Sequence, residues 1–345
     1  MRENLIVSII VPVLNEQDTI ARFVKDCVPV LEKVCRDQLK SGSYEIIFID
    51  DGSADATRPA ILAEARVNPN IKLVRFSRNF GKEAALAAGF RHATGDAVIP
   101  MDVDLQDPPE VVPRMVEKWL EGAEIVNAIR RRRDTDTAIK RFTARLFYKL
   151  YNKIADIPIK ADVGDFRLLD RAVVDTLNEL SEGSRFTKAL YSWVGYRNVD
   201  IEYDRAGRSG GDSKWPYRRL VRFALDGLIG STTAPLRVWS YLGLLIGFCA
   251  FVYAAIVIVK TAILGIDVPG YASTLVTVLL LGGLNLLSLG IMGEYIGRMS
   301  QEVRNRPLYV VRETYGWADD KGKSSRLESA PGRSEMASPV AAKRK

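Results

Sequence analysis

From residue 5 to about residue 128, short apolar runs alternate with amphipathic segments. The pattern predicts strands over Val7–Val11, Tyr44–Ile49, Ile71–Phe76, Ala97–Met101 and Ile125–Ala128. It predicts helices that begin near Glu16, Asp55, Lys82 and Pro109. Strands that alternate with helices are typical of an α/β fold with a mostly parallel sheet and helices on both faces. Such sheets bind ligands at the carboxyl ends of their strands.

Two longer apolar stretches, Val238–Val259 and Tyr271–Gly293, contain no charged residue. Each reaches the about 20 residues that a helix needs to cross the hydrocarbon core of a membrane. Buried core helices are the alternative, but two such stretches joined by a short connector disfavour it. The pattern therefore predicts two transmembrane helices over residues 238–296.

Basic residues flank the outer ends of both stretches, at Arg218, Arg219, Arg222, Arg237, Arg298, Arg304 and Arg306. The connector holds only Lys260 and Asp267 as charged residues. Because Lys and Arg concentrate on the cytoplasmic side of membrane proteins, both termini are expected in the cytoplasm. The sequence thus predicts a multi-pass protein of the cell (inner) membrane.

The remaining segments differ in composition. Residues 216–237 predict an amphipathic juxtamembrane helix that lies in the membrane interface. Residues 204–215, DRAGRSGGDSKW, predict a mobile basic loop. Residues 297–345 form a cytoplasmic tail that we expect to be disordered after about residue 318, where no apolar period remains. Residues 1–215 are left as one cytoplasmic domain.

The chain has 345 residues and a formal net charge of +7, from 49 Lys and Arg against 42 Asp and Glu. The excess suits anionic partners such as phosphates or acidic lipids. Nucleic acid is not expected, because no zinc-finger spacing or RNA-binding aromatic signature is present. His92 is the single histidine, so a histidine metal site or a Ser-His-Asp triad is disfavoured.

Acidic residues follow two of the predicted strands. Asp50 and Asp51 end the second strand, and two adjacent carboxylates are costly unless they bind something, such as a base or ribose edge. Asp102 and Asp104 follow the fourth strand, and on an extended segment both side chains would point to the same side. Converging carboxylates bind hard cations such as Mg²⁺ or Mn²⁺, which would neutralise a diphosphate. An Asp-x-Asp pair alone is a weak signal, but its place at a strand end strengthens it.

Five motifs together, SIIVPVLNE, IDDGSADAT, NFGKEAALAAGF, MDVDLQDPPE and GDFRLLDR, resemble those of the family-2, A-fold glycosyltransferases. Within this family the chain is similar to the group of bactoprenol glucosyltransferase and dolichyl-phosphate mannosyltransferase. The similarity covers residues 5 to about 310. It implies a Rossmann-like A-type catalytic domain that transfers a sugar from a nucleotide-sugar to a polyprenyl phosphate with inversion.

The resemblance also implies site residues. Those for the nucleotide are Pro12, Glu16, Asp50, Asp51 and Asp102. Those for the metal, Mg²⁺ or Mn²⁺, are Asp102 and Asp104. Those for the diphosphate or acceptor phosphate are Gln106, Arg205, Arg208, Ser213 and Lys214. Those for catalysis are Asp165, as the base, with Arg130 and Arg133 beside the acceptor phosphate.

Some positions stay open. Lys82 and Glu83 are either charges at a helix start or part of the pocket wall, and Asn15 would cap the helix beginning near Glu16. Asp107 would cap the helix that begins near Pro109. A processive polysaccharide synthase is disfavoured, because its Q-x-x-R-W motif is matched only by Gln301-Glu302-Val303-Arg304 followed by Asn305.

The expected donor is UDP-glucose and the expected acceptor is undecaprenyl phosphate, in contact with membrane lipids. UDP-galactose, UDP-N-acetylglucosamine and GDP-mannose stay open as donors, and transfer of mannose from GDP-mannose is the alternative function within the same class. A nucleotidyltransferase and a non-catalytic membrane scaffold are the rivals outside it. Whether the chain forms a homo-oligomer is left open.

Overall fold

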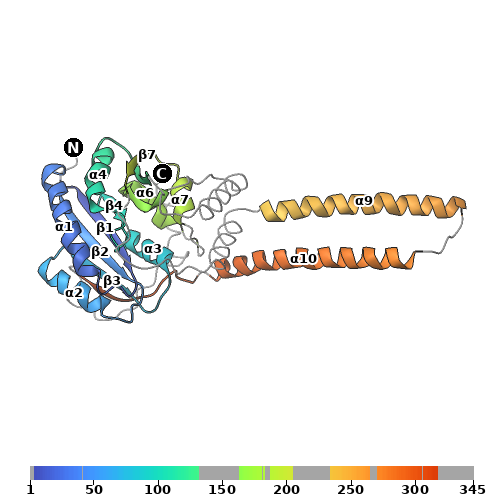
Figure 1. Ribbon diagram of the computed structural model, residues 1–345, viewed down its shortest axis with the longest axis horizontal. Helices are drawn as coiled ribbons and strands as arrows, with labels where there is room; N and C mark the ends of the chain where they lie inside the picture. The colour runs from blue at the N-terminus through green and yellow to red at the C-terminus, as the bar shows by residue number, and fades with distance from the viewer. Residues whose placement is uncertain are drawn as a thin grey trace, which may run out of the picture. The chain divides into compact units, whose positions relative to one another are not determined.

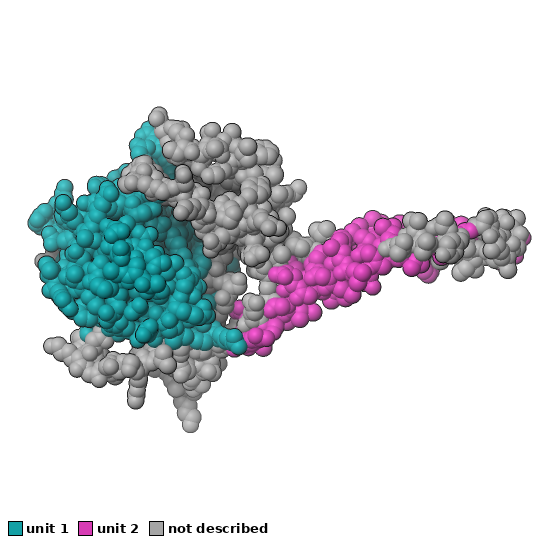
Figure 2. Space-filling view, turned by 60° about the horizontal axis from the view of Figure 1, so that its bottom comes forward, with its two compact units in different colours: residues 1–149, 157–214, 305–345 teal, residues 150–156, 215–304 magenta. Residues whose placement is uncertain are grey.

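The computed structural model describes residues 4–40, 42–131, 163–180, 182, 187–204, 234–264, 270–304 and 306–317. The chain divides into two compact units, which Figure 2 shows in separate colours. The first unit contains the described residues up to 204 together with 306–317, and the second contains the described residues 234–304.

The described strands of the first unit form one sheet of eight, in the order β7-β5-β6-β4-β1-β2-β3-β8. Their bounds are β1 Ile6–Val13, β2 Ser43–Asp50, β3 Ile71–Phe76, β4 Ala97–Pro100, β5 Ile125–Arg130, β6 Val163–Asp170, β7 Asn198–Tyr203 and β8 Val311–Tyr315. Four neighbouring pairs are parallel and three are antiparallel. The predicted mostly parallel sheet is therefore confirmed, and each of the five predicted strands is present.

Helices cover both faces of this sheet (Figure 1). On one face lie α1 (Ile20–Asp37), α2 (Thr57–Val67) and α4 (Val112–Leu120), which the short 3₁₀ helix η1 (Pro109–Val111) precedes. On the other lie α3 (Lys82–His92), α6 (Arg171–Glu179) and α7 (Thr187–Trp193). Strand residues are buried against both layers: Ile9 packs into the first core and Ile10 into the second. Burial on both faces explains why these strands read as unbroken apolar runs.

Strand direction decides which side chains meet at the edge of the sheet. β1, β2, β3 and β4 are parallel, so their carboxyl ends lie at one edge. β6 runs antiparallel to β4, so its amino end lies at that same edge. Asp165, near the start of β6, is thereby brought to the edge where Asp50 ends β2 and Asp102 follows β4.

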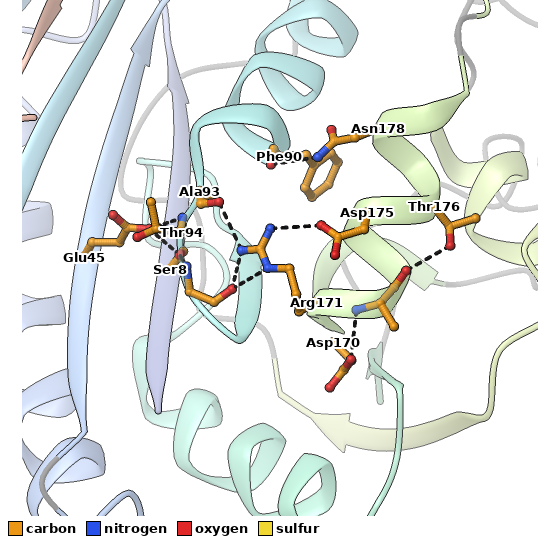
Figure 3. A network of polar contacts seen from close by, with 12 residues as sticks. Ser8, Glu45, Phe90, Ala93, Thr94, Asp170, Arg171, Asp175, Thr176 and Asn178 are labelled. Carbon is orange, nitrogen blue, oxygen red and sulfur yellow. Dashed lines mark hydrogen bonds and ion pairs between the residues drawn. The ribbon is translucent and has the colours of Figure 1, made fainter. Parts of the chain in front are cut away.

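The opposite edge of the sheet is held by a polar network (Figure 3). Buried Glu45 accepts hydrogen bonds from Ser8 Oγ at 2.5 Å and from the Thr94 backbone at 2.6 Å, and it pairs with Lys72 Nζ at 2.6 Å. Arg171 at the start of α6 donates from Nε to the Gly95 carbonyl at 2.8 Å. The network joins β1, β2, the loop before β4 and α6 at the amino ends of the strands, and so holds these elements in place relative to one another.

The chain returns to this unit after α10 and adds β8 as an edge strand, antiparallel to β3. Arg58 of α2 makes two contacts with Glu313, of which Nε to Oε2 measures 2.8 Å. The Tyr309 ring stacks on Phe76, with centroids 4.9 Å apart. Residues 306–317 are therefore part of the first unit, which the sequence pattern did not predict.

The second unit consists, in the described residues, of two long helices in contact, α9 (Ala234–Leu264) and α10 (Tyr271–Val303). Apolar side chains such as Phe248, Leu286 and Met299 are exposed on them. Two helices were predicted here, and two are present.

Only one described stretch, Leu280–Gly297 of α10, is long and apolar enough to cross a membrane by length and composition. In α9 the apolar stretch within the described residues is Tyr241–Tyr253. The prediction of two transmembrane helices is therefore not confirmed and stays a prediction. The predicted interfacial helix after Pro216 and the tail beyond Trp317 lie outside the described residues.

Candidate active site

The two adjacent carboxylates at the end of β2 accept hydrogen bonds and an ion pair from other groups of the protein. Asp50 is fully buried, accepts from the Ser53 backbone N–H at 2.7 Å, and has Arg75 Nε 3.2 Å from Oδ2. Asp51 accepts from the backbone N–H groups of Phe80 at 2.6 Å and Gly81 at 2.9 Å. Burial raises the pKa of Asp51, although these two N–H groups act in the opposite direction. The cost of adjacent carboxylates is thus offset internally, and a contact with the nucleotide stays a prediction.

Gly52 lets the loop of residues 78–81 approach these carboxylates. Its φ is +76°, in the left-handed region that favours glycine. A Cβ atom at this position would lie 2.5 Å from the Arg78 carbonyl carbon. The glycine of the IDDGS motif is therefore required by close backbone packing.

The segment after β1 differs from its prediction. The first helix begins at Ile20, and Asn15 is not its cap. Asn15 has a φ of +56°, and its side chain accepts from the Ala54 backbone at 2.9 Å. Asn15 instead ties the end of β1 to the loop after β2.

The two predicted nucleotide residues of this segment lie at the same strand end. Pro12 is half-buried in β1 opposite Ile49 of β2. The Glu16 backbone donates to Thr57 Oγ1 at 2.8 Å, while its carboxylate accepts from Thr19 Oγ1 at 3.0 Å.

The Asp-x-Asp pair does not lie on an extended segment. β4 ends at Pro100, and a turn follows in which Leu105 has a φ of +55°. Asp104 is exposed and accepts from the Gln106 backbone at 3.0 Å, whereas Asp102 is partly exposed. The premise that this segment is extended is wrong, because a turn follows β4, and the convergence of the two carboxylates stays a prediction.

Lys82, the first residue of α3, joins two of the predicted site residues. Its Nζ lies 2.6 Å from Asp102 Oδ1 and 3.0 Å from Asp165 Oδ2. Burial alone would raise the pKa of Asp165, but Lys82 and then Lys188 hold it below its ordinary value. Burial alone would lower the pKa of Lys82, but Asp102 and Asp165 raise it. Lys82 and Asp165 are therefore both charged at neutral pH.

One carboxylate oxygen of Asp165 can still accept a hydrogen bond from another group. Its Oδ1 is buried and has no hydrogen-bond partner within the described part of the chain. A buried carboxylate oxygen without a donor is costly, so such an atom marks a place where a ligand or water is expected to bind. This fits the predicted role of Asp165 beside the acceptor.

Arg130, at the end of β5, is held by a buried tyrosine. Tyr203, which ends β7, hydrogen-bonds to Arg130 and donates its hydroxyl to Asp107. Burial, followed by the Asp107 carboxylate, raises the pKa of Tyr203 to about 12. Asp107 was expected to cap the helix after it, but η1 has no side-chain cap, and Asp107 contacts Tyr203 instead.

Sequence inspection did not assign roles to several residues of this site. Glu83 accepts from the Thr187 backbone at 3.1 Å, and burial raises its pKa. Arg167 is buried, with its guanidinium 3.9 Å from the Tyr191 ring centroid. The motifs NFGKEAA and GDFRLLDR carried the available signal, since they contain Lys82, Glu83 and Arg167.

The predicted residues Arg133, Arg205, Arg208, Ser213 and Lys214 lie outside the described residues.

The oxygen ligands at this edge fit a divalent cation that a substrate helps to bind. Asp102 and Asp104 offer carboxylates, which Mg²⁺ and Mn²⁺ prefer. Among the described residues no three His, Cys, Asp or Glu side chains converge on one point. A cation here would take its remaining ligands from a diphosphate and water, as Mg²⁺ usually does.

The sheet is that of a Rossmann-like α/β domain, with acidic side chains at its strand ends and cationic groups around them. The model for glycosyl transferase family 2 matches residues 8–177, and the model described as the GtrB C-terminal hairpin matches residues 234–299. The chain therefore belongs to glycosyl transferase family 2, and the predicted membership is confirmed.

Two relatives and one solved structure illustrate the similarity. The chain is 47% identical over 311 residues to the SfII prophage-derived bactoprenol glucosyl transferase of Shigella flexneri, across 90% of this chain and 98% of that protein. It is 47% identical to the prophage bactoprenol glucosyl transferase homolog of Escherichia coli K12, across 89% and 98%. A mannosyltransferase of Pyrobaculum calidifontis, solved with GDP-mannose and Mn²⁺, aligns over 87% of each chain with 20% identity and a TM-score of 0.45.

Proposed function

We propose that this protein transfers glucose from UDP-glucose to undecaprenyl phosphate at the cytoplasmic face of a membrane. The observation that carries the proposal is the 47% identity to bactoprenol glucosyl transferases over 90% of the chain. That similarity extends through both the catalytic unit and the helical hairpin. A lipid-phosphate acceptor accounts for both parts, since the hairpin would keep the catalytic unit at the membrane.

The reaction is one displacement. A phosphate oxygen of the acceptor attacks the anomeric carbon of glucose, the bond from that carbon to the UDP oxygen breaks, and UDP leaves with the electron pair. Because the second ionisation of a phosphate ester lies near pH 6, the acceptor is already largely anionic at neutral pH. Asp165 therefore acts mainly by orienting the acceptor and taking its residual proton.

Cationic side chains offset the repulsion between an anionic acceptor and an anionic donor. Arg130 is supported in this role by its position at the end of β5 and by its contact with Tyr203. Arg133, Arg208 and Lys214 complete the countercharge in the proposal, because charge-assisted hydrogen bonds are the strong ones. Asp102 and Asp104 would hold Mg²⁺ or Mn²⁺, which when bound neutralises charge on the departing diphosphate.

The hairpin is proposed to cross the membrane twice. The exposed apolar side chains of α9 and α10 support this arrangement. The chain leaves the catalytic unit after β7 and re-enters it in β8, so both outer ends of the hairpin belong on the same side. The arginines that flank those ends favour the cytoplasmic side.

A labelled-donor panel tests the proposal. The purified full chain in detergent micelles is given undecaprenyl phosphate and radiolabelled UDP-glucose, UDP-galactose, UDP-N-acetylglucosamine or GDP-mannose. Label from UDP-glucose should enter the lipid fraction, stop with a chelator and resume with Mn²⁺. Asp102→Ala and Asp104→Ala should each lose this divalent-dependent transfer. Label from GDP-mannose alone would overturn the donor, and no lipid-linked label from any donor would overturn the reaction.

A further inference from the structure

Lys82 is the group in the site whose role neither the sequence motifs nor the proposed reaction assigns. Its Nζ touches the first carboxylate of the Asp-x-Asp pair and the proposed base, at 2.6 Å and 3.0 Å. The ammonium therefore stands between two groups that the reaction uses for different purposes. We propose that Lys82 is a positioning residue: it holds Asp102 and Asp165 together in the metal-free site, and it gives up Asp102 when a divalent cation binds. This inference rests on the proposed function for the identity of the donor.

The backbone of Lys82 is fixed. Asp51 accepts from the N–H groups of Phe80 and Gly81, directly before α3. Gly81 has a φ of +99°, which a residue with a side chain would rarely adopt. Since the helix start is anchored from β2, any movement must come from the lysine side chain, whose four-carbon stem is flexible. That side chain is 44% exposed, so it has room to change direction.

The lysine and the metal compete for one oxygen atom. The ammonium lies 2.6 Å from Asp102 Oδ1. A Mg²⁺ or Mn²⁺ ion coordinated to that oxygen at about 2.1 Å would lie within ~5 Å of the ammonium. Two cations at that separation repel each other, so binding of the metal favours release of Lys82 from Asp102. The 3.0 Å contact with Asp165 needs no such exchange and keeps that carboxylate anionic and oriented.

Before the metal binds, the Lys82 ammonium offsets repulsion between the carboxylates of the site. The carboxylates of Asp102 and Asp165 lie on either side of one ammonium group, at 2.6 Å and 3.0 Å from Lys82 Nζ, and half-buried Glu83 follows Lys82 in the chain. Without a counterion, carboxylates that converge repel one another and shift their pKa values upward. A tethered ammonium keeps them in place until a divalent cation and a diphosphate replace it.

Metal binding to the full chain without nucleotide tests this role directly. Free Mn²⁺ is measured by electron paramagnetic resonance during titration of the wild type, Lys82→Met and Lys82→Arg. Lys118→Met is the matched control, because Lys118 pairs with Glu121 at 2.7 Å on the surface of α4. Removing the competitor should tighten Mn²⁺ binding by about three- to tenfold in Lys82→Met, a change within the range of one partly exposed charge contact. Lys82→Arg should stay near the wild type, and Lys118→Met should be unchanged.

Steady-state kinetics should separate the turnover number from the dependence of the rate on Mn²⁺. In Lys82→Met the turnover number should fall, because Asp165 loses its orienting cation, while the Mn²⁺ concentration for half-maximal rate also falls. A lysine with a merely structural role would weaken metal binding on removal, because Asp102 and Asp165 would separate. Weaker or unchanged Mn²⁺ binding in Lys82→Met, or no Mn²⁺ binding by either protein, would overturn the inference. The titration needs no sugar transfer, so failure of the proposed reaction would be seen separately.

Discussion

At the scale of single residues, carboxylates of the catalytic unit are held by donors from other parts of the chain. Glu45 is held by Lys72 and Ser8, Asp50 by Arg75, and Asp165 by Lys82. Glu45 lies at the amino edge of the sheet, and Asp165 lies at the edge where the strand ends meet. The same kind of contact therefore joins the strands at one edge and, in the proposed mechanism, holds the base at the other.

Glu45→Gln should lower stability in a pH-dependent way. Although burial alone would raise the pKa of Glu45, Lys72, Ser8 and Thr94 hold it below its ordinary value of 4.5. A depressed folded-state pKa stabilises the protein above the unfolded pKa, and the effect is lost as pH falls through the folded value. The variant should lose about 1–3 kcal/mol at pH 7 by thermal unfolding. The gap to the wild type should narrow below pH 4.5, and a gap independent of pH would contradict the assigned ion pair.

Asp165→Asn should impair turnover without unfolding the protein. The amide keeps the shape of the side chain but loses the charge that Lys82 and the acceptor proton need. We expect kcat to fall by about ten- to a hundredfold. This loss is smaller than the loss of a general base usually causes, because the acceptor is already mostly ionised. Rate and melting temperature are measured on the same preparation. A near-normal rate in a folded variant would remove Asp165 from the mechanism.

At the scale of elements, the strands that could be predicted are those buried on both faces. β1 to β5 appear in the sequence as apolar runs, because helices cover both faces of the sheet there. β8 could not be predicted in this way, since VRETY has charged residues and an edge position. Its partner β3 lies more than two hundred residues earlier in the chain, beyond a pattern confined to local periodicity.

The candidate site also has a part that could be predicted from the sequence and a part that could not. The motifs were sufficient to select Asp102, Asp104 and Asp165 as candidates. The contact of Lys82 with two of them could not be predicted, because it arises where the start of α3 meets the ends of β4 and β6. The turn at Asp104 was not predicted, because Leu105 has a left-handed backbone conformation that is rare for leucine.

Tyr309→Ala should show that the C-terminal segment of residues 306–317 stabilises the catalytic unit. Tyr309 is 2% exposed and stacks on Phe76. Removal of a buried aromatic side chain typically costs about 3–5 kcal/mol, so the melting temperature of the full chain should fall clearly. Arg22→Ala, which breaks only the exposed contact with Asp26, is the control and should have little effect. Equal melting temperatures in the two variants would mean that the contact of Tyr309 with Phe76 adds no stability.

At the scale of the whole molecule, the order of the chain constrains how it can meet a membrane. The helical hairpin is inserted between β7 and β8, two strands of one sheet. A hairpin with both ends in one folded unit must cross a bilayer an even number of times or lie on it. This connectivity supports the proposed two spans independently of hydropathy.

Cysteine labelling should reveal the orientation. In a chain whose native Cys27, Cys35 and Cys249 are replaced by serine, Gly265→Cys should react with an impermeant maleimide added to intact cells. Ala330→Cys should react only after the cells are lysed. The opposite pattern would place the catalytic unit outside the cell, away from cytoplasmic nucleotide-sugars.

The central claim is that the product is a lipid-linked sugar. Purified full-length protein is incubated with undecaprenyl phosphate, UDP-glucose and Mn²⁺, and the lipid is analysed by mass spectrometry, with Asp165→Asn as the parallel control. The account predicts that undecaprenyl phosphate gains the mass of one hexose, in an amount that follows the wild-type enzyme and drops with the variant. Unmodified lipid alongside free glucose and UDP would contradict it, because the sugar would then have been transferred to water.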